Sequence, residues 1–282
     1  MKTNPVLKKA VLLGSVGAAM LATTVQAQFN APRGNMLFAA REMNGAARGA
    51  YDVVVDLGAF TRFTSGTSAL LLGGASASEA YQGIGPATAS ENRFANSTLV
   101  STFGNLDNVF ASAFAVNSGA SPTANSSFFL TKARTDVDVA STPWARASAF
   151  SQGGTGNKME TVRNNAVNSG VDVNATSTVE DAGVSAAYGH ANNSPITGYT
   201  AMEGTTGAGF GGSSIVRLDL YNVAFGTGPS DYIGYFEYQG DGDLWFVPEN
   251  FVPVPEASTY GLVAGAGLLF MALRRQMSNK TA

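Results

Sequence analysis

The residue types that most often carry enzymatic chemistry are sparse in this chain of 282 residues. It has no cysteine and a single histidine, His190, in the loop-like stretch AAYGHANNS. A serine nucleophile would need that histidine beside it, and the sequence contains no Gly-x-Ser-x-Gly turn to present such a serine. The lack of cysteine also excludes thiol catalysis and cysteine-ligated zinc. We therefore expect His190 to be a surface residue.

Two pairs of closely spaced acids are candidates for metal binding. Asp241 and Asp243 in QGDGDLW resemble half of a calcium loop, but no third ligand or closing glutamate follows at the required spacing. Asp and Gly also form tight turns, so a hairpin turn explains the same residues. Asp136 and Asp138 in TDVDVA alternate with apolar positions, which predicts the polar face of a strand. We expect no metal site and no bound cofactor, since phosphate-binding and dinucleotide motifs are also missing from the sequence.

Carbohydrate chemistry remains an alternative. Two carboxylates on opposite sides of a cleft could cleave a glycosidic bond, and their spacing along the sequence does not report their distance in space. Trp144, Trp245 and the tyrosines could stack on sugar rings, although aromatic side chains more commonly pack in a core. We predict that the protein is not an enzyme, and we keep a polysaccharide-binding or polysaccharide-cleaving secreted protein as the alternative.

The N-terminal region has the three-part layout of a secretory signal peptide. Three lysines within the first nine residues precede an apolar stretch at 10–22, and Val25 and Ala27 are small residues at the positions that signal peptidase inspects. We predict that residues 1–27 are removed by signal peptidase between Ala27 and Gln28. A membrane-spanning or core helix is the alternative, but the stretch is short for a span and polar, glycine-rich sequence follows it.

Charge is distributed unevenly between the ends and the body. Six of the 17 Lys and Arg residues lie in the end segments but only one of the 20 Asp and Glu residues does, so the body has 11 cations against 19 acids and a net charge of −8. An acidic body argues against nucleic acid as a partner, because phosphate binding needs clustered cations. An exported chain without disulfides must be held by its core, and residues 28–251 are enough for a single domain.

The C-terminal region combines a proline-flanked acid, an uncharged apolar segment and two arginines. The apolar segment begins at Tyr260 and ends at Leu273, so as a helix it would measure ~21 Å against ~30 Å for the hydrocarbon core of a bilayer. Such a segment spans only where the bilayer thins, while Arg274 and Arg275 stay in the cytoplasm and Glu256 stays outside. This pattern predicts transient anchoring in the inner membrane, with a cleavable stretch just outside it. A permanent anchor or a packed terminal helix is the alternative.

Residues 252–277 resemble the PEP-CTERM sorting signal, in which a Pro-Glu-Pro motif, usually followed by Ser-Thr, precedes a short apolar helix and an arginine cluster. Pro255 and Glu256 match the motif, Ala257 replaces its second proline, and Ser258 and Thr259 follow. The resemblance implies export by a Gram-negative bacterium that makes exopolysaccharide. It also implies that an exosortase, a membrane cysteine protease, removes the tail. The final location would then be the cell surface or the extracellular matrix, with exopolysaccharide as a candidate partner.

The composition of the body predicts a mainly β fold. Only 13% of the chain is charged, and small and polar residues dominate, which favours strands joined by glycine- and asparagine-rich turns. We expect one antiparallel, β-sandwich-like domain with minor helix. Apolar and alternating patterns predict strands at 36–43, 51–57, 108–116, 127–132, 215–224, 232–238 and 244–247. The last three are expected to pair antiparallel.

Turns and helices are predicted from glycine positions and from helical spacing. In the first hairpin, Asn44-Gly45 would begin the connection and Gly49 would end it, with Val53 and Val55 on one face of the second strand. A short helix should lie within 91–104 and stop at Gly104. A second helix is expected where Met159, Val162 and Ala166 share helical spacing, with Gly170 as its C-terminal cap. The region 171–212 predicts long loops with irregular strands.

Overall fold

The body forms one large antiparallel sheet with a small second sheet beside it. The computed structural model describes residues 28–44, 47–74, 77–83, 87–104, 106, 108–116, 127–136, 138–146, 148–174, 176–182, 186–188, 199, 201–204 and 215–251. The predicted signal peptide and the predicted sorting segment lie outside these residues. Within them, no helix is both long enough and apolar enough to cross a membrane.

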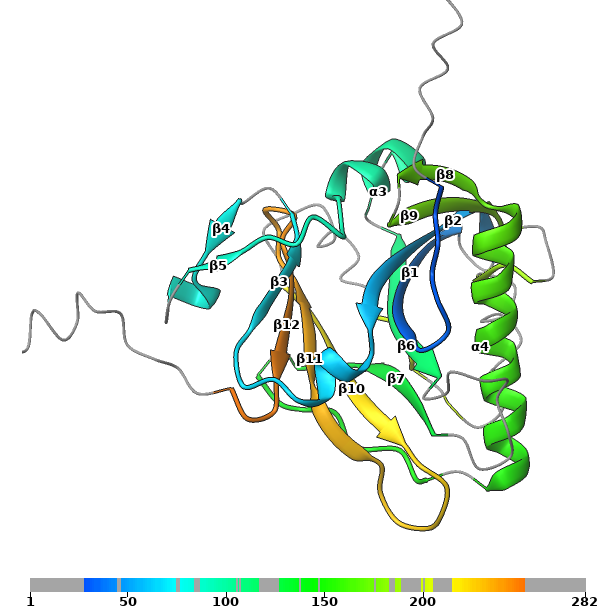
Figure 1. Cartoon of the computed structure of the whole chain (residues 1–282), viewed down its shortest axis with the longest axis vertical. Coiled ribbons are helices and arrows are strands. Elements are labelled where there is room, and N and C mark those ends of the chain that lie inside the picture. The colour runs from blue at the N-terminus through cyan, green and yellow to red at the C-terminus, as the bar shows by residue number, and fades with distance from the viewer. Residues whose placement is uncertain are drawn as a thin grey trace, which may run out of the picture.

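The large sheet has ten strands in the order β3-β12-β11-β10-β7-β6-β1-β2-β9-β8 (Figure 1). These strands are β1 (Asn35–Asn44), β2 (Ala47–Ala59), β3 (Leu70–Gly73), β6 (Val109–Val116), β7 (Phe128–Ala133), β8 (Val171–Asn174), β9 (Ser177–Asp181), β10 (Val216–Val223), β11 (Asp231–Tyr238) and β12 (Leu244–Pro248). The small sheet pairs β4 (Ser78–Glu79) with β5 (Thr88–Ala89). The helices are α2 (Thr61–Thr64), α3 (Asn96–Phe103), α4 (Ala149–Ser169) and the 3₁₀ turn η1 (Tyr81–Gly83).

The large sheet curls, so that strands far apart in its order face the same core. Phe94 shows this directly, because its ring lies 5.4 Å from Phe38 of β1 and 5.7 Å from Tyr238 of β11, measured between ring centroids. These strands are four places apart in the sheet, which would separate them by ~19 Å if it were flat. The mainly β, antiparallel prediction is therefore confirmed. One continuous curled sheet supplies the two facing halves that we expected from two separate sheets.

The concave face of the sheet encloses the inner core, and two short helices close it. Phe63 of α2 packs against Phe236 and Phe246, with centroid distances of 5.6 Å and 5.0 Å, and Leu99 of α3 is fully buried in the same cluster. As predicted, α3 ends at Gly104, whose φ of 70° a residue with a side chain would rarely adopt. These contacts connect the two halves of the curled sheet.

The convex face is covered on one half by α4, which lies along the strands near β9 and β6 (Figure 1). Met159, Val162 and Ala166 all point into this second cluster, the helix-side core, as their spacing predicted. Residues 52–58 of β2 are buried throughout, because this strand has the inner core on one face and the helix-side core on the other. Val53 and Val55 face the inner core and Val54 the helix side, which confirms the predicted alternation.

The start of α4 was not predicted, and the predicted cap needs correction. The helix begins at Ala149, ten residues before Met159, through a glycine-rich stretch with low helix propensity. Burial of Thr155 and Gly156 against the body overrides that propensity. The helix does end before Gly170, but the φ of this glycine lies outside the left-handed region, so it is not the expected cap. A Cβ there would lie 2.2 Å from Thr178 Oγ1, and close approach is the reason for the glycine.

Both predicted strand pairings form, but the connection of the first hairpin is shorter than predicted. Pairing of β1 with β2 continues to Asn44 and Ala47, so Gly49 lies inside β2 and does not end the connection. The predicted C-terminal meander is confirmed, since β10, β11 and β12 pair antiparallel with Leu218 opposite Phe236 and Phe236 opposite Phe246. In 171–212, the short strands β8 and β9 agree with the irregular strands that we expected there, and they add to the far edge of the sheet.

Candidate functional site

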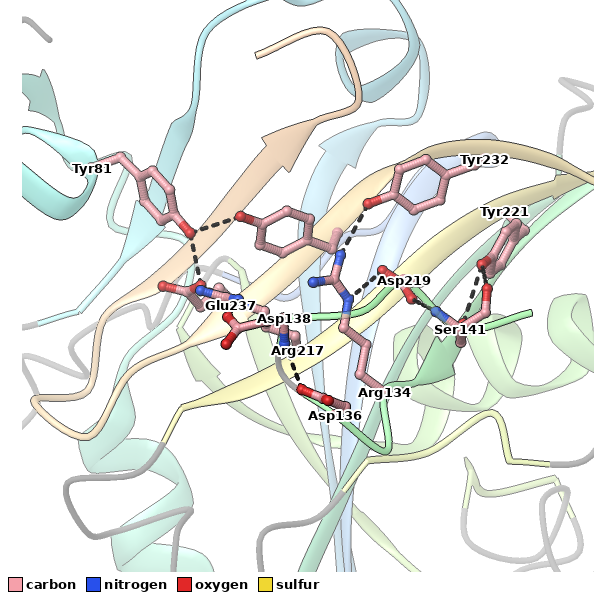
Figure 2. Close-up of polar contacts among 11 residues, drawn as sticks. Tyr81, Arg134, Asp136, Asp138, Ser141, Arg217, Asp219, Tyr221, Tyr232 and Glu237 are labelled. Carbon is pink, nitrogen blue, oxygen red and sulfur yellow. Dashed lines mark hydrogen bonds and ion pairs between the residues drawn. The ribbon is translucent and has the colours of Figure 1, made fainter. Parts of the chain in front are cut away.

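Four ionisable residues form a row on the convex face of β10 and its neighbours, which we call the charged row: Arg134, Arg217, Asp219 and Glu237 (Figure 2). Arg217 and Asp219 alternate along β10 with residues that face the inner core, so both project to the convex side. Glu237 lies opposite Arg217 in the pairing of β10 with β11. Arg134 directly follows β7, the other neighbour of β10.

Each carboxylate of the charged row is fully buried and is surrounded by donors. Glu237 Oε2 accepts from Arg217 Nε at 2.6 Å and from the Tyr81 hydroxyl at 2.7 Å. Asp219 accepts from Arg134 Nε at 2.7 Å and from the backbone N–H of Ser141 at 2.6 Å. Both acids are 0% exposed. Buried charges are tolerated only with such pairing and hydrogen bonding, so the acids and arginines of the row depend on one another.

Tyrosine side chains complete the row. The guanidinium carbons of Arg134 and Arg217 lie 4.4 Å and 5.3 Å from the centroid of the Tyr235 ring, which is within cation–π range. The hydroxyls of Tyr235 and Tyr81 are 2.9 Å apart, and Tyr232 accepts from Arg134 Nη2 at 3.2 Å. Burial raises the pKa of Tyr81 and of Tyr232 above the ordinary value, so both phenols stay neutral at physiological pH.

The geometry of the charged row suits cohesion better than acid–base catalysis. A catalytic carboxylate must come within hydrogen-bond reach of a substrate, and solvent does not reach Asp219 or Glu237. The row instead ties β7, β10, β11 and η1 together. Beside the row, Tyr232 and Tyr235 are half-buried and could contact a ligand at the surface, whereas the Arg217 side chain is only 11% exposed.

A second polar cluster consists of Arg41, Ser112, Tyr188 and Glu203. Arg41 donates to both carboxylate oxygens of Glu203, at 2.7 Å from Nε and 2.5 Å from Nη2. The Tyr188 hydroxyl donates to Glu203 at 2.7 Å and lies 2.6 Å from the Ser112 hydroxyl. Burial raises the pKa of Tyr188 well above its ordinary value. This cluster joins β1 and β6 to two segments of the region 171–212.

Glu180 is a buried acid whose pKa lies well above its ordinary value. Its carboxylate accepts from Asn165 Nδ2 of α4 at 2.8 Å and from the backbone N–H of Tyr188 at 3.3 Å. Burial raises its pKa to about 7, and the nearby Asp52, opposite it in the pairing of β2 with β9, adds to the increase. Glycosidic cleavage needs a sugar and water between two carboxylates, but Asp52 and Glu180 are 0% and 1% exposed. This pair is therefore not placed to cleave a polysaccharide.

The aspartates singled out in the sequence occupy two turns. Asp241 and Asp243 lie in the β11–β12 connection, where the Asp243 N–H donates to Asp241 Oδ1 at 3.1 Å, so the hairpin-turn interpretation is confirmed. Asp136 and Asp138 do not lie on a strand face, and that prediction is wrong. β7 ends at Ala133, and the Asp138 N–H donates to Asp136 Oδ1 at 3.0 Å, because a short acidic side chain can close its own turn.

The remaining candidates from the sequence are aromatic or terminal. Trp144 and Trp245 are 8% and 0% exposed and pack in aromatic clusters, which confirms core packing as their role. His190 lies outside the described residues. So do Ala27 and the sorting residues: Pro255, Glu256, Ala257, Ser258, Thr259, Tyr260, Leu273, Arg274 and Arg275. Gln28 is described and is exposed. In the described ranges, no group of three or more His, Asp and Glu side chains is arranged to hold a metal ion.

Sequence reasoning did not identify the charged row. Arg217 and Asp219 alternate with apolar residues within the predicted strand 215–224, but alternation alone suggests a solvated polar face. The only available signal was the placement of Glu237 among aromatic residues in YIGYFEYQ, where an acid without a cation would be costly to bury. The partner cation comes from a different strand, so the sequence could not identify it.

Comparison with known proteins adds no family to these observations. No protein-family model, curated protein or solved structure matches this chain.

Proposed function

We propose that this is an exported, non-enzymatic protein of a Gram-negative cell surface or extracellular matrix. Its tail holds it briefly in the inner membrane, and an exosortase releases it. The mature body then serves as a structural or interaction component of the exopolysaccharide matrix. The family resemblance of residues 252–277 is the origin of this proposal, and two features of the body support it.

The first is the position of the packed residues nearest the two ends of the described chain. Phe29 is 0% exposed in the helix-side core and is the second residue after the predicted signal-peptide cut before Gln28. At the other end, Phe251 packs against Tyr81 only four positions before Pro255. The two predicted processing points therefore flank the packed body, and neither cut would remove a residue from its core.

The second feature is the set of buried ion pairs in the body, which suit a stable extracellular protein. The chain has no disulfide, and its buried charges are paired across strands in the charged row and in the Arg41–Glu203 cluster. Such pairs fix strand positions at some cost in desolvation, so they favour one well-defined arrangement over a loosely packed one.

The tail is tested by separating its two roles. Replacing Arg274 and Arg275 with Ala should weaken membrane retention, because moving each cation into hydrocarbon costs at least ~2.5 kcal/mol. Intact protein should then pass through or invert. Replacing Pro255 and Glu256 with Ala should leave retention intact but prevent cutting, so uncut protein should accumulate in membranes. Cell fractionation and mass spectrometry of the C-terminus read out both results.

Two outcomes would overturn this proposal. One is wild-type protein outside the cell that still carries the apolar segment from Tyr260 to Leu273. The other is normal release of the Pro255→Ala/Glu256→Ala double variant. Either result would make the tail an anchor or a packed helix.

Polysaccharide binding is the second candidate, and two half-buried tyrosines favour it: Tyr235 lies beside Arg217, and Tyr232 lies beside Arg134. Aromatic faces and guanidinium donors are suited to sugar rings and hydroxyls. Affinity electrophoresis in the producer's own polymer, together with a reducing-end assay, separates the alternatives. Retardation without new ends, reduced in Tyr232→Ala but not in Tyr51→Ala, supports binding. New ends indicate an enzyme, and neither effect supports a purely structural role.

A further inference from the structure

The chain is folded back onto the body where it leaves the last strand. After β12, the Glu249 N–H donates to Ile233 O at 2.8 Å and the Phe251 N–H donates to Pro248 O at 3.0 Å. The Phe251 ring then meets the Tyr81 ring edge-on, with centroids 5.7 Å apart and an interplanar angle of 89°. The exit of the chain is thus held by two backbone hydrogen bonds and one aromatic contact.

Tyr81 reaches this position from a different part of the chain. Its ring packs against Trp245 at 5.3 Å, and its hydroxyl donates to Glu237, so it is only 4% exposed. The next residue, Gln82, has φ +50° and ψ 29°, a backbone conformation that costs free energy for a residue other than glycine. The buried contacts of Tyr81 compensate for this strain. We call the three rings of Tyr81, Trp245 and Phe251 the aromatic clasp.

The aromatic clasp sets the length of chain available to a processing enzyme. Three residues, 252–254, separate Phe251 from Pro255, so the motif lies within ~14 Å of the clasp even when the chain is fully extended. If the clasp opened and the exit came free as far as Pro248 at the end of β12, the reach would grow to ~25 Å. The clasp therefore decides whether the folded body lies directly beside the motif.

A protease needs an extended and unhindered segment, and cutting is fastest where the backbone is neither buried nor hydrogen-bonded. We infer that the aromatic clasp limits the rate at which the tail is removed. A closed clasp holds the bulk of the body against the processing enzyme, and an open clasp frees the exit chain. This inference rests on the proposed function, in which an exosortase cuts near Pro255 and Glu256.

Two variants of the full-length protein test the inference in the producing bacterium. Phe251→Ser removes one ring of the clasp, and an insertion of four Gly/Ser residues after Phe251 lengthens the spacer while leaving the clasp intact. Pulse-chase labelling measures the half-time for conversion of membrane-held protein to the tail-free form. We expect both variants to shorten this half-time at least threefold.

Phe225→Ser is the matched control, because Phe225 is 53% exposed and lies in the β10–β11 connection, outside the clasp. Its half-time should equal that of wild type. The inference is overturned if the insertion variant is processed at the wild-type rate or more slowly, whether or not Phe251→Ser folds. If the insertion variant overturns the inference but the tail of the Pro255→Ala/Glu256→Ala variant is not cut in the same assay, the proposed function stands. If this double variant is also cut normally, the proposed function itself is wrong.

Discussion

Arg217 and Glu237 lie directly opposite each other on β10 and β11, and Arg217 Nε donates to the fully buried Glu237 carboxylate at 2.6 Å. The same carboxylate accepts from Tyr81, whose ring contacts Phe251 at the exit of the chain. A cross-strand ion pair on the sheet and the end of the body are therefore connected through one buried acid. Some of the same residues should therefore influence both the free energy of unfolding and the rate at which the tail is removed.

Removing one partner from the charged row should be costly. Asp219→Ala leaves the guanidinium of Arg134 buried without its carboxylate, since the two side chains are 0% and 7% exposed. Breaking a buried pair in this way costs about 3–5 kcal/mol, and we expect that loss in the free energy of unfolding. Chemical denaturation of the purified exported protein measures it.

Asp231→Ala is the matched control for the same strand neighbourhood. Asp231 pairs with Arg146 at 2.7 Å, but its side chain is 51% exposed, so its removal should cost no more than ~1 kcal/mol. Equal losses in the two variants would contradict a structural role for the charged row.

Glu180 should make stability depend on pH. Its pKa is raised from an ordinary value of 4.5 to about 7 in the folded protein, chiefly by burial. The folded state therefore binds more protons than the unfolded state between these values, and the free energy of unfolding should fall as pH rises from about 4.5 through 7. The total change from this group is at most about 3 kcal/mol.

Glu180→Gln removes the titrating group and should flatten that decline. Urea denaturation at pH 5 and pH 8 gives the comparison, and the difference between wild type and variant isolates the contribution of Glu180. Asp181→Asn makes the same carboxylate-to-amide change at the exposed neighbouring position on β9, and this control should alter the slope less than Glu180→Gln does. A wild-type slope that survives Glu180→Gln would show that another group is responsible.

Two glycine substitutions should change stability in opposite directions. A Cβ at Gly73 would lie 2.1 Å from the carbonyl oxygen of Phe94, which belongs to the backbone and cannot move aside cheaply, so Gly73→Ala should destabilise the fold strongly. Nothing lies within 4 Å of a Cβ at Gly154 in α4, so Gly154→Ala should stabilise by about 0.5–1 kcal/mol. Thermal unfolding of both variants checks the signs, and a stabilising Gly73→Ala would refute the close approach.

The signal-peptide prediction concerns the other end of the body. We expect the exported protein to begin at Gln28, because cutting there leaves the buried Phe29 in place. N-terminal sequencing of protein recovered outside the cell is the test. A sequence that starts at Met1 would exclude the signal peptide, and one that starts after Phe29 would mean that processing removes a core residue.

Local pattern was sufficient for most of the strands. Alternation along β10 and β11 predicted both their extent and their pairing, because period-2 burial and short connections make neighbouring strands antiparallel. Helical spacing of Met159, Val162 and Ala166 likewise predicted the buried face of α4. The signals predicted at the two ends depend only on short contiguous stretches, and they stay predictions because they lie outside the described residues.

The tertiary structure decided the features that depend on distant partners. The alternation of Arg217 and Asp219 with apolar residues predicts two polar positions on one face of β10. Whether that face is solvent-exposed or buried depends on Arg134 and Tyr81, which come from other parts of the chain. The start of α4 at Ala149 likewise could not be predicted locally, since its glycines oppose a helix, and the first described buried positions of its N-terminal half are Thr155 and Gly156. A sequence pattern indicates which face of a strand or helix a residue occupies. Burial and pairing of side chains arise only when the curled sheet brings remote segments together. For this reason the charged row and the aromatic clasp could be identified only in the folded protein.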